Sequence, residues 1–318
     1  MKKEDLRIVY MGTPDFAVES LRTLYESGYN VVGVVTMPDK PAGRGHKIQF
    51  SPVKQYALDN HLRLLQPEKL KDEAFLAELK SLQADLQIVV AFRMLPEVVW
   101  DMPKLGTFNL HASLLPQYRG AAPINWAIIN GETETGVTTF FLTHEIDTGN
   151  IILQEKTPIS SEENAGDIHD RLMKMGGELV LKTVDLILEG KAQGQAQAHI
   201  ADLKPAPKIF KETCKIDWQK NTDEIYNFVR GLSPYPAAWT ELKSPNGEVL
   251  TLKVFETKTE KTTHNEPVGT LLTDGKKFIK IAVSDGYLHL ISIQLPSKKR
   301  MSAEDVLRGF NFAGFEIF

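Results

Sequence analysis

The chain has 318 residues, of which 25% are charged and 42% hydrophobic, and a net charge of −4. These are the proportions of an ordinary globular protein with room for two domains. A single cysteine, Cys214, excludes an intramolecular disulfide, and no run approaches the ~18–20 apolar residues of a membrane span.

A reducing compartment suits this cysteine content, so we expect a cytoplasmic protein with no membrane segment. Neither CxxC nor HExxH occurs, and the histidines other than His111 lack the spacing typical of metal ligands, so no metal site is expected.

The first elements form a β-α-β unit. An apolar run at 6–12 ends in glycine and predicts a strand, and 31–36 predicts a second buried strand. Between them Thr13 can cap a helix, Pro14 suits its first turn and Gly28 ends it. Units of this kind build parallel sheets.

The same alternation continues to residue 189. Helices are expected near 52–60, 68–82, 123–130 and 164–189, and strands at 86–92, 106–113, 136–143 and 150–159. We therefore predict an α/β fold for 1–189, built on a Rossmann-like, mostly parallel sheet.

Residues 190–207 are rich in Gly, Ala, Gln and Pro without a period and predict a linker. Residues 208–318 contain short strands separated by turn signals, which favours a smaller, mainly β, barrel-like domain. This second part carries 16 Lys and Arg against 14 Asp and Glu, whereas residues 1–205 carry 21 against 27. The asymmetry hints at an acidic partner for the second domain.

Two polar residues interrupt the strand at 106–113. Asn109 and His111 alternate with Phe108 and Leu110, so both should lie on one face where a central strand is normally apolar. An amide and an imidazole suit acyl transfer, in which one group stabilises an oxyanion and the other moves a proton. A hydrogen-bonded core pair is the alternative.

Asp147, in the turn EIDTGN, is the candidate third member, able to orient the imidazole or accept a proton. An acidic residue in a turn is also a common turn former. Ser113 lies outside any GxSxG elbow, which disfavours a serine nucleophile.

The segment 36–54 carries Lys40, Arg44 and Lys47 among Pro and Gly. It is either a basic finger that grips phosphates, mobile until a partner orders it, or a solvated surface loop.

Several sequence motifs of this chain occur together, in an order that is found in a known family. The motifs MGTPDF, PDKPAGRG, SPVK, NLHASLLPQYRGAAPI, GVT and IDTGN, followed by IDW, LSPYPAAW and KKRMSAEDVL, make the chain similar to the methionyl-tRNA formyltransferases. The resemblance runs almost from end to end. HASLLPxYRGAAPI with IDTG marks the folate-dependent formyltransferase superfamily, and PAGRG with the second domain narrows it to the tRNA enzymes.

The resemblance implies transfer of a formyl group from 10-formyltetrahydrofolate, a co-substrate, to the methionine of initiator methionyl-tRNA, without a metal. The family's catalytic positions match Asn109, His111 and Asp147. The SLLP motif matches Ser113, Leu114, Leu115 and Pro116 at the folate site. The PAGRG loop matches residues 41–45, which implies that Arg44 reaches the acceptor stem, with Lys40 and Lys47 of the same basic segment on either side. The second domain resembles an oligonucleotide-binding (OB-like) barrel that would hold the tRNA body, and we expect Lys208, Lys211 and Lys298 to contact the tRNA there.

One stretch departs from the family. Where members often show AYG before a longer apolar run, this chain has Phe92, Arg93 and Met94, one residue shorter. That loop borders the folate pocket in the family, so we expect these three residues to reshape it, with Arg93 contacting folate or pointing to solvent.

Two enzyme alternatives share the three polar residues: a formyltransferase acting on a small amine, such as a nucleotide sugar or glycinamide ribonucleotide, and a formyltetrahydrofolate hydrolase. A tRNA-binding protein without catalysis is the alternative from another class. We expect a monomer.

Overall fold

The computed structural model describes residues 2–42 and 47–317 and divides into two compact units. The first unit contains Met1–Gly120, Thr135–Thr157 and His169–Pro205. The second contains Ala121–Glu134, Pro158–Ile168 and Ala206–Phe318. Two short segments that precede residue 169 are therefore part of the unit that holds the C-terminal residues.

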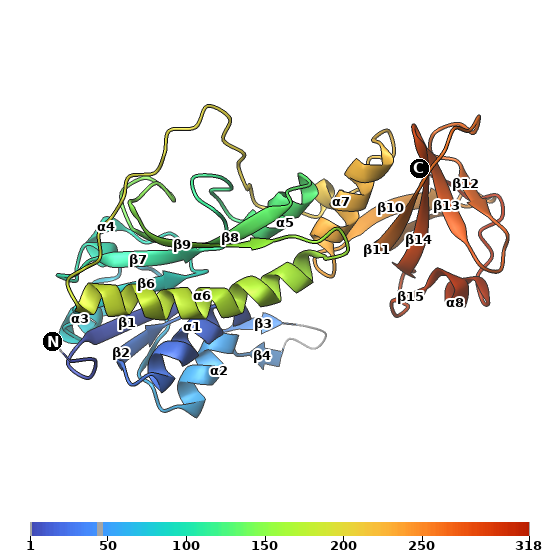
Figure 1. Ribbon diagram of the computed structural model, residues 1–318. Coiled ribbons are helices and arrows are strands. Elements are labelled where there is room, and N and C mark those ends of the chain that lie inside the picture. Colours follow the sequence, from blue (N-terminus) through green and yellow to red (C-terminus); the bar gives the residue numbers. More distant parts are fainter. Residues whose placement is uncertain (1, 43–46, 318) are drawn as a thin grey trace. The chain divides into compact units, whose positions relative to one another are not determined.

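The first unit is built on a seven-stranded sheet in the order β5-β2-β1-β6-β7-β8-β9 (Figure 1). Its pairs from β5 to β7 are parallel, whereas β8 runs antiparallel to β7. The predicted mostly parallel sheet is confirmed. The strands are β1 (Arg7–Gly12), β2 (Asn30–Val35), β5 (Leu64–Leu65), β6 (Leu86–Val90), β7 (Thr107–His111), β8 (Glu134–Phe141) and β9 (Ile151–Pro158).

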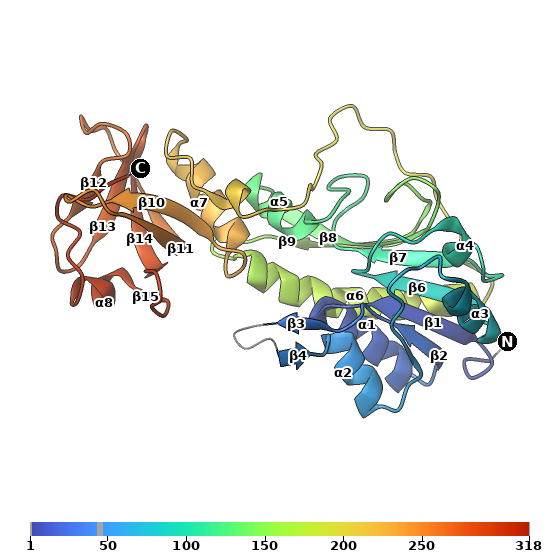
Figure 2. The ribbon, with the colours of Figure 1, turned by 180° about the vertical axis from the view of Figure 1, so that it is seen from behind.

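Helices cover both faces of this sheet (Figures 1 and 2). On one face Gly176 of α6 lies so close to Leu110 that a Cβ there would meet its side chain at 2.6 Å. On the other face Val89 packs in one apolar cluster with Phe75 of α3 and Val99 of α4. The helices are α1 (Asp15–Glu26), α2 (Pro52–Asp59), α3 (Glu73–Ser81), α4 (Glu97–Trp100) and α6 (Ala165–Leu188).

Two local details differ from the sequence-based expectation. The N-cap of α1 is Pro14 and has no side-chain cap, so Thr13 does not cap it. Thr13 stands one residue too early, and its hydroxyl instead accepts from Thr36 at 3.4 Å. The basic segment, expected as a loop, contains a short antiparallel pair, β3 (Lys40–Ala42) and β4 (Lys47–Gln49).

The second unit contains a nearly closed antiparallel barrel, which confirms the predicted C-terminal architecture. Its strands follow the order β12-β13-β14-β11-β10-β16, with β15 paired to β14. Asn221 and Glu224 form a reciprocal capping box that starts α7, whose Ile225 and Val229 join the barrel core. The elements are α5 (Pro123–Ile129), η1 (Glu212–Cys214), α7 (Thr222–Leu232), β10 (Ala238–Lys243), β11 (Val249–Lys261), β12 (Leu271–Thr273), β13 (Ile279–Val283), β14 (Gly286–Gln294), β15 (Met301–Ser302), α8 (Ala303–Leu307) and β16 (Glu316–Ile317).

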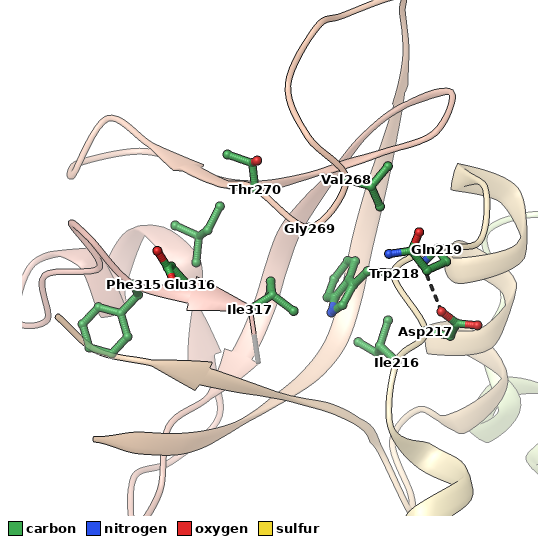
Figure 3. Close-up of a pocket in the computed structure, with 11 residues that line it drawn as sticks. Ile216, Asp217, Trp218, Gln219, Val268, Gly269, Thr270, Phe315, Glu316 and Ile317 are labelled. Atoms are coloured by element: carbon green, nitrogen blue, oxygen red, sulfur yellow. Dashed lines mark hydrogen bonds between the residues drawn. The ribbon is translucent and has the colours of Figure 1, made fainter. Parts of the chain in front are cut away.

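A cavity of about 560 Å³ opens between the two end strands of this barrel (Figure 3). It is lined by Leu271 of β12, by Glu316 and Ile317 of β16, and by the indole of Trp218. The IDW motif (216–218) contributes to its lining, but none of the candidate catalytic, folate-binding or tRNA-binding residues does. Within the described ranges, no helix is both long and apolar enough to cross a membrane.

Candidate active site

The candidate site is built on β7, which lies between β6 and β8 in the sheet. Leu110 of β7 faces α6, whereas the Thr107 hydroxyl donates to the Trp100 carbonyl of α4 at 2.6 Å on the opposite face. Because side chains alternate along a strand, Asn109 and His111 share the face of Thr107. Both polar residues therefore lie on one face of β7, as expected from the sequence.

The Asn109 amide is half-buried, and it has no hydrogen-bond partner among the described residues. An amide that belonged to a satisfied core pair would be bonded, because buried polar groups are rarely left without partners. Asn109 therefore retains both a donor and an acceptor for another molecule.

The imidazole of His111 is held in one orientation. Its Nε2 lies 2.8 Å from the carbonyl oxygen of Tyr118, and only 7% of the residue is exposed. A carbonyl can only accept, so Nε2 carries a hydrogen and donates it. The other nitrogen, Nδ1, lies 4.0 Å from Oδ2 of Asp147, close enough for the carboxylate charge to act on the imidazole but too far for a direct hydrogen bond.

Asp147 reaches the imidazole because its loop folds back. The loop leaves β8 beside the amino end of β7, where the Leu142 amide donates to the Thr107 carbonyl at 2.8 Å. It returns to place Asp147 at the carboxyl end, where Oδ2 accepts from the Gly120 amide at 3.0 Å. Asp147 adopts a left-handed backbone conformation, with φ of 57°, which Asp and Asn tolerate better than most residues.

The sequence interpretation missed the side chains that hold this loop. The Gln197 amide donates to the carbonyls of Asp147 at 2.7 Å and Gly149 at 2.9 Å. Its oxygen accepts from the Arg119 guanidinium at 2.6 Å. Gln197 lies in the segment expected as a linker, and nothing in that run of Gln and Ala distinguishes it from its neighbours.

Gly149 permits the fold-back, and Gly149→Ala tests it. A Cβ at this position would lie 1.6 Å from the Phe141 carbonyl oxygen, so the loop must move. We expect at least about a tenfold loss of kcat, because small displacements of catalytic groups are costly. The matched control is Gly309→Ala, which would meet nothing within 4 Å and should leave kcat and Tm unchanged. Wild-type kcat in Gly149→Ala would show that the position of this loop does not matter.

The SLLP residues are mostly internal. Ser113 is fully buried and its hydroxyl donates to the Gln117 carbonyl at 2.7 Å. Leu115 and Pro116 are buried, and Leu114 is half-buried beside Gly136. These residues shape the turn after β7, and Leu114 is the most accessible of the four.

The loop after β6 presents three contrasting side chains. Met94 is 72% exposed, whereas Phe92 packs partly against the apolar cluster beneath α3 and α4. Arg93 does not extend into solvent: its Nη1 donates to the Glu68 carbonyl at 2.8 Å and its Nη2 to the Pro67 carbonyl. Burial lowers the pKa of this guanidinium below its ordinary value.

The basic residues of the β3–β4 segment are only partly described. Lys40 is exposed at the start of β3. Lys47 begins β4, but its side chain lies outside the described atoms, and Arg44 lies outside the described residues altogether.

In the second unit Lys208, Lys211 and Lys298 are all exposed. Lys208 lies 5.4 Å from the ring centroid of Phe210, a residue that is itself 55% exposed, and Lys211 lies 5.9 Å from that of Trp239. Lysines beside accessible aromatic rings are typical of nucleic-acid-binding surfaces. In the part of the chain that the structure describes, no three His, Cys, Asp or Glu side chains gather as a metal site would require.

Solved structures of similar fold support the assignment of the architecture. An N-formyltransferase from Helicobacter canadensis, solved with folinic acid and dTDP-3-aminofucose, matches with a TM-score of 0.64 at 22% identity, over 95% of this chain and 100% of that one. HypX from Aquifex aeolicus, solved with tetrahydrofolic acid, matches with a TM-score of 0.63 at 19% identity, over 98% of this chain and 50% of that one. At these identities the likeness concerns the fold.

Sequence comparisons are more specific. Residues 6–184 match the formyl transferase family and residues 208–311 match the formyl transferase C-terminal domain. The methionyl-tRNA formyltransferase of Bacteroides thetaiotaomicron is 66% identical over 98% of both chains, and that of Flavobacterium johnsoniae is 59% identical, also over 98% of both. With similarity of this degree along nearly its whole length, the chain belongs to the methionyl-tRNA formyltransferase family.

Proposed function

We propose that the chain transfers the formyl group of 10-formyltetrahydrofolate to the amino group of the methionine carried by initiator methionyl-tRNA, the formylation that precedes translation initiation. The observation that carries the proposal is the convergence of Asn109, His111 and Asp147 at one edge of the sheet, in a chain whose full-length relatives are methionyl-tRNA formyltransferases.

Each of the three side chains has a proposed role. The methionine amine attacks the formyl carbon, and the carbonyl oxygen becomes an oxyanion to which Asn109 donates from its unpartnered amide. A proton on His111 Nδ1 adds a second donor, with Asp147 stabilising the positive charge. The C–N bond to the folate then breaks, tetrahydrofolate leaves with the electron pair, and the amine proton passes through Asp147 or His111 to the leaving nitrogen.

The two substrates are assigned to different parts of the chain. We assign the folate to Phe92, Arg93, Met94 and Ser113–Pro116, with Leu114, Phe92 and Met94 presenting the most accessible apolar surface. The acceptor is assigned to the β3–β4 segment and to Lys208, Lys211 and Lys298. The functional division that we propose is 1–189 for catalysis, 190–207 as a linker and 208–318 for tRNA binding, in a monomer.

One assay tests the proposal: purified protein with 10-formyltetrahydrofolate and, as acceptor, either charged initiator tRNA or free methionine. We expect formylmethionine on the tRNA only. Release of formate, or formylation of a small amine in place of the tRNA, would be compatible with the roles of the three polar residues but would show that methionyl-tRNA is not the acceptor.

Replacing Arg44 with alanine tests the assignment of the basic segment to the acceptor. We expect KM for methionyl-tRNA to rise about tenfold, because a phosphate contact is lost, with KM for the folate within about twofold of wild type. The increase should shrink as salt is raised, which titration at two ionic strengths would measure. Equal increases in both KM values would contradict the assignment of Arg44 to the tRNA site.

A further inference from the structure

Three loops meet at the edge of the first-unit sheet that carries the candidate site. They follow β2, β5 and β6, and the parallel register aligns their starting points, because Val35 lies beside both Leu65 and Met11, and Gly12 beside Val90. The loops are residues 36–39, 66–68 and 91–95. The reaction as proposed gives the middle loop no role.

Arg93 ties the loop after β6 to the loop after β5. Its guanidinium donates to two consecutive carbonyls, those of Pro67 and Glu68. The planar fork of arginine suits such a pair of acceptors better than the single ammonium of lysine does. Its Nε is buried without a hydrogen-bond partner among the described residues, so the two Nη bonds provide its polar anchorage.

Gln66 ties the loop after β5 to the root of the β3–β4 hairpin. Its Nε2 donates to the Met37 carbonyl and to Oδ1 of Asp39, both at 3.0 Å. The other oxygen of Asp39 accepts from Nζ of Lys54 at 2.5 Å, and this bond holds the pKa of Asp39 below its ordinary value.

Lys54 in turn fixes the far end of the hairpin. Only 8% of the residue is exposed, and its ammonium lies 3.9 Å from the ring centroid of Phe50, the residue after β4. Asp39 precedes β3 directly. The pair therefore joins the two ends of the segment that carries Lys40, Arg44 and Lys47.

These contacts form one continuous chain, because Gln66, Pro67 and Glu68 are consecutive residues. We call Arg93, Gln66, Asp39 and Lys54 the loop bridge. At one end it holds the loop assigned to the folate, and at the other the hairpin assigned to the tRNA.

We propose that the loop bridge couples the two substrate sites, so that binding of tRNA at the hairpin increases the affinity of the 91–95 loop for the folate, and the reverse. Gln66 and Asp39 are positioning residues in this proposal, and Arg93, which the proposed function also assigns to the folate site, acts here through its bonds to residues 67 and 68. It rests on the proposed function, because it takes the assignment of each loop to its substrate from there.

The coupling follows from the shared middle segment. If residues 91–95 shift, the hydrogen-bond donors of Arg93 move relative to the Pro67 and Glu68 carbonyls. Residues 66–68 must then move with them or lose these bonds, and their movement distorts the bonds of Gln66 at the hairpin root. Binding that holds either loop in the bridged arrangement thus favours the other. Linkage requires that the effect of each ligand on the other be equal.

The test measures the Kd of 5-formyltetrahydrofolate, an isomer of the proposed donor, with and without saturating uncharged initiator tRNA. In the wild-type protein we expect the tRNA to lower this Kd about fivefold, at the low end of coupling effects. In Arg93→Met and in Gln66→Leu the ratio should fall below about twofold, and the double variant should lose no more than either single variant.

The control is Arg63→Met, since Arg63 lies three residues before Gln66 but its side chain bonds, among the described residues, only to Glu78 at 3.0 Å, in a pair whose side chains are 51% and 45% exposed. It should retain the wild-type ratio. If Arg93→Met lowers Tm strongly, Arg93→Lys repeats the test with the charge and one bond retained, and an intermediate ratio is expected.

Two results would overturn the inference: a wild-type ratio near one, or a ratio that Arg93→Met and Gln66→Leu leave unchanged in folded protein. Formyl transfer to methionyl-tRNA is measured alongside in the wild-type protein. If formyl transfer occurs but the tRNA does not change the Kd of the folate, the coupling role of the loop bridge is rejected and the proposed function stands. If no formyl transfer occurs, the proposed function itself is rejected.

Discussion

Replacing His111 with alanine is expected to lower kcat for formyl transfer by about 10²–10⁴-fold, the range over which a positioned acid–base group contributes. The imidazole presents Nδ1 to the carboxylate of Asp147 at 4.0 Å, while Nε2 is occupied by the Tyr118 carbonyl. Alanine removes both contacts. Single-turnover rates with saturating substrates would isolate the chemical step.

Stability must be measured beside the rate, because His111→Ala also removes the hydrogen bond between Nε2 and the Tyr118 carbonyl. Loss of one hydrogen bond costs about 0.5–1.5 kcal/mol, which a well-folded chain of this size tolerates. His144→Ala is the matched control: its side chain is 72% exposed and belongs to the loop that carries Asp147. Turnover close to wild type in folded His111→Ala would remove the imidazole from the mechanism.

Asp147→Asn should lower kcat by about 10²-fold or more, because it removes the charge that stabilises a protonated imidazole, a contribution expected to exceed that of an exposed ion pair. The amide oxygen can still accept from the Gly120 amide, and asparagine tolerates the left-handed backbone at φ of 57°. The substitution therefore changes charge with little change in geometry, and KM for both substrates should remain near wild type.

Alanine at position 147 would confound this measurement, because it adds roughly 1–2 kcal/mol of backbone strain to the loss of charge. Glu145→Gln is the better control, since it neutralises an exposed carboxylate of the same loop. Equal effects of Asp147→Asn and Glu145→Gln would indicate a general electrostatic effect and assign Asp147 no specific part.

Truncation is a poor test of the second unit. Residues 121–134 and 158–168 belong to it, and Ile129 of α5 packs against the barrel's core cluster. Deleting 208–318 would expose that surface, so single substitutions at Lys208, Lys211 and Lys298 test tRNA binding more cleanly.

Much of the first unit could be predicted because its signals are local. The apolar run of β6 and the alternation of Asn109 and His111 with Phe108 and Leu110 specify strands and faces through the two-residue period of a strand. The same period put both polar side chains on one face before any contact was known. Motif order was specific enough to indicate the family, and the relatives confirm it.

The sequence alone thus determined the fold class, the family and the pairing of an amide with an imidazole on β7, because each depends on residue type and short spacing. The tertiary structure decided how Asp147 returns across the sheet to His111, how Gln197 from the expected linker holds that loop, and how Arg93 turns toward Pro67 and Glu68. These contacts join residues 25 or more positions apart. Their partners are mostly backbone carbonyls and amides, which every residue carries, so no residue type marks them in advance.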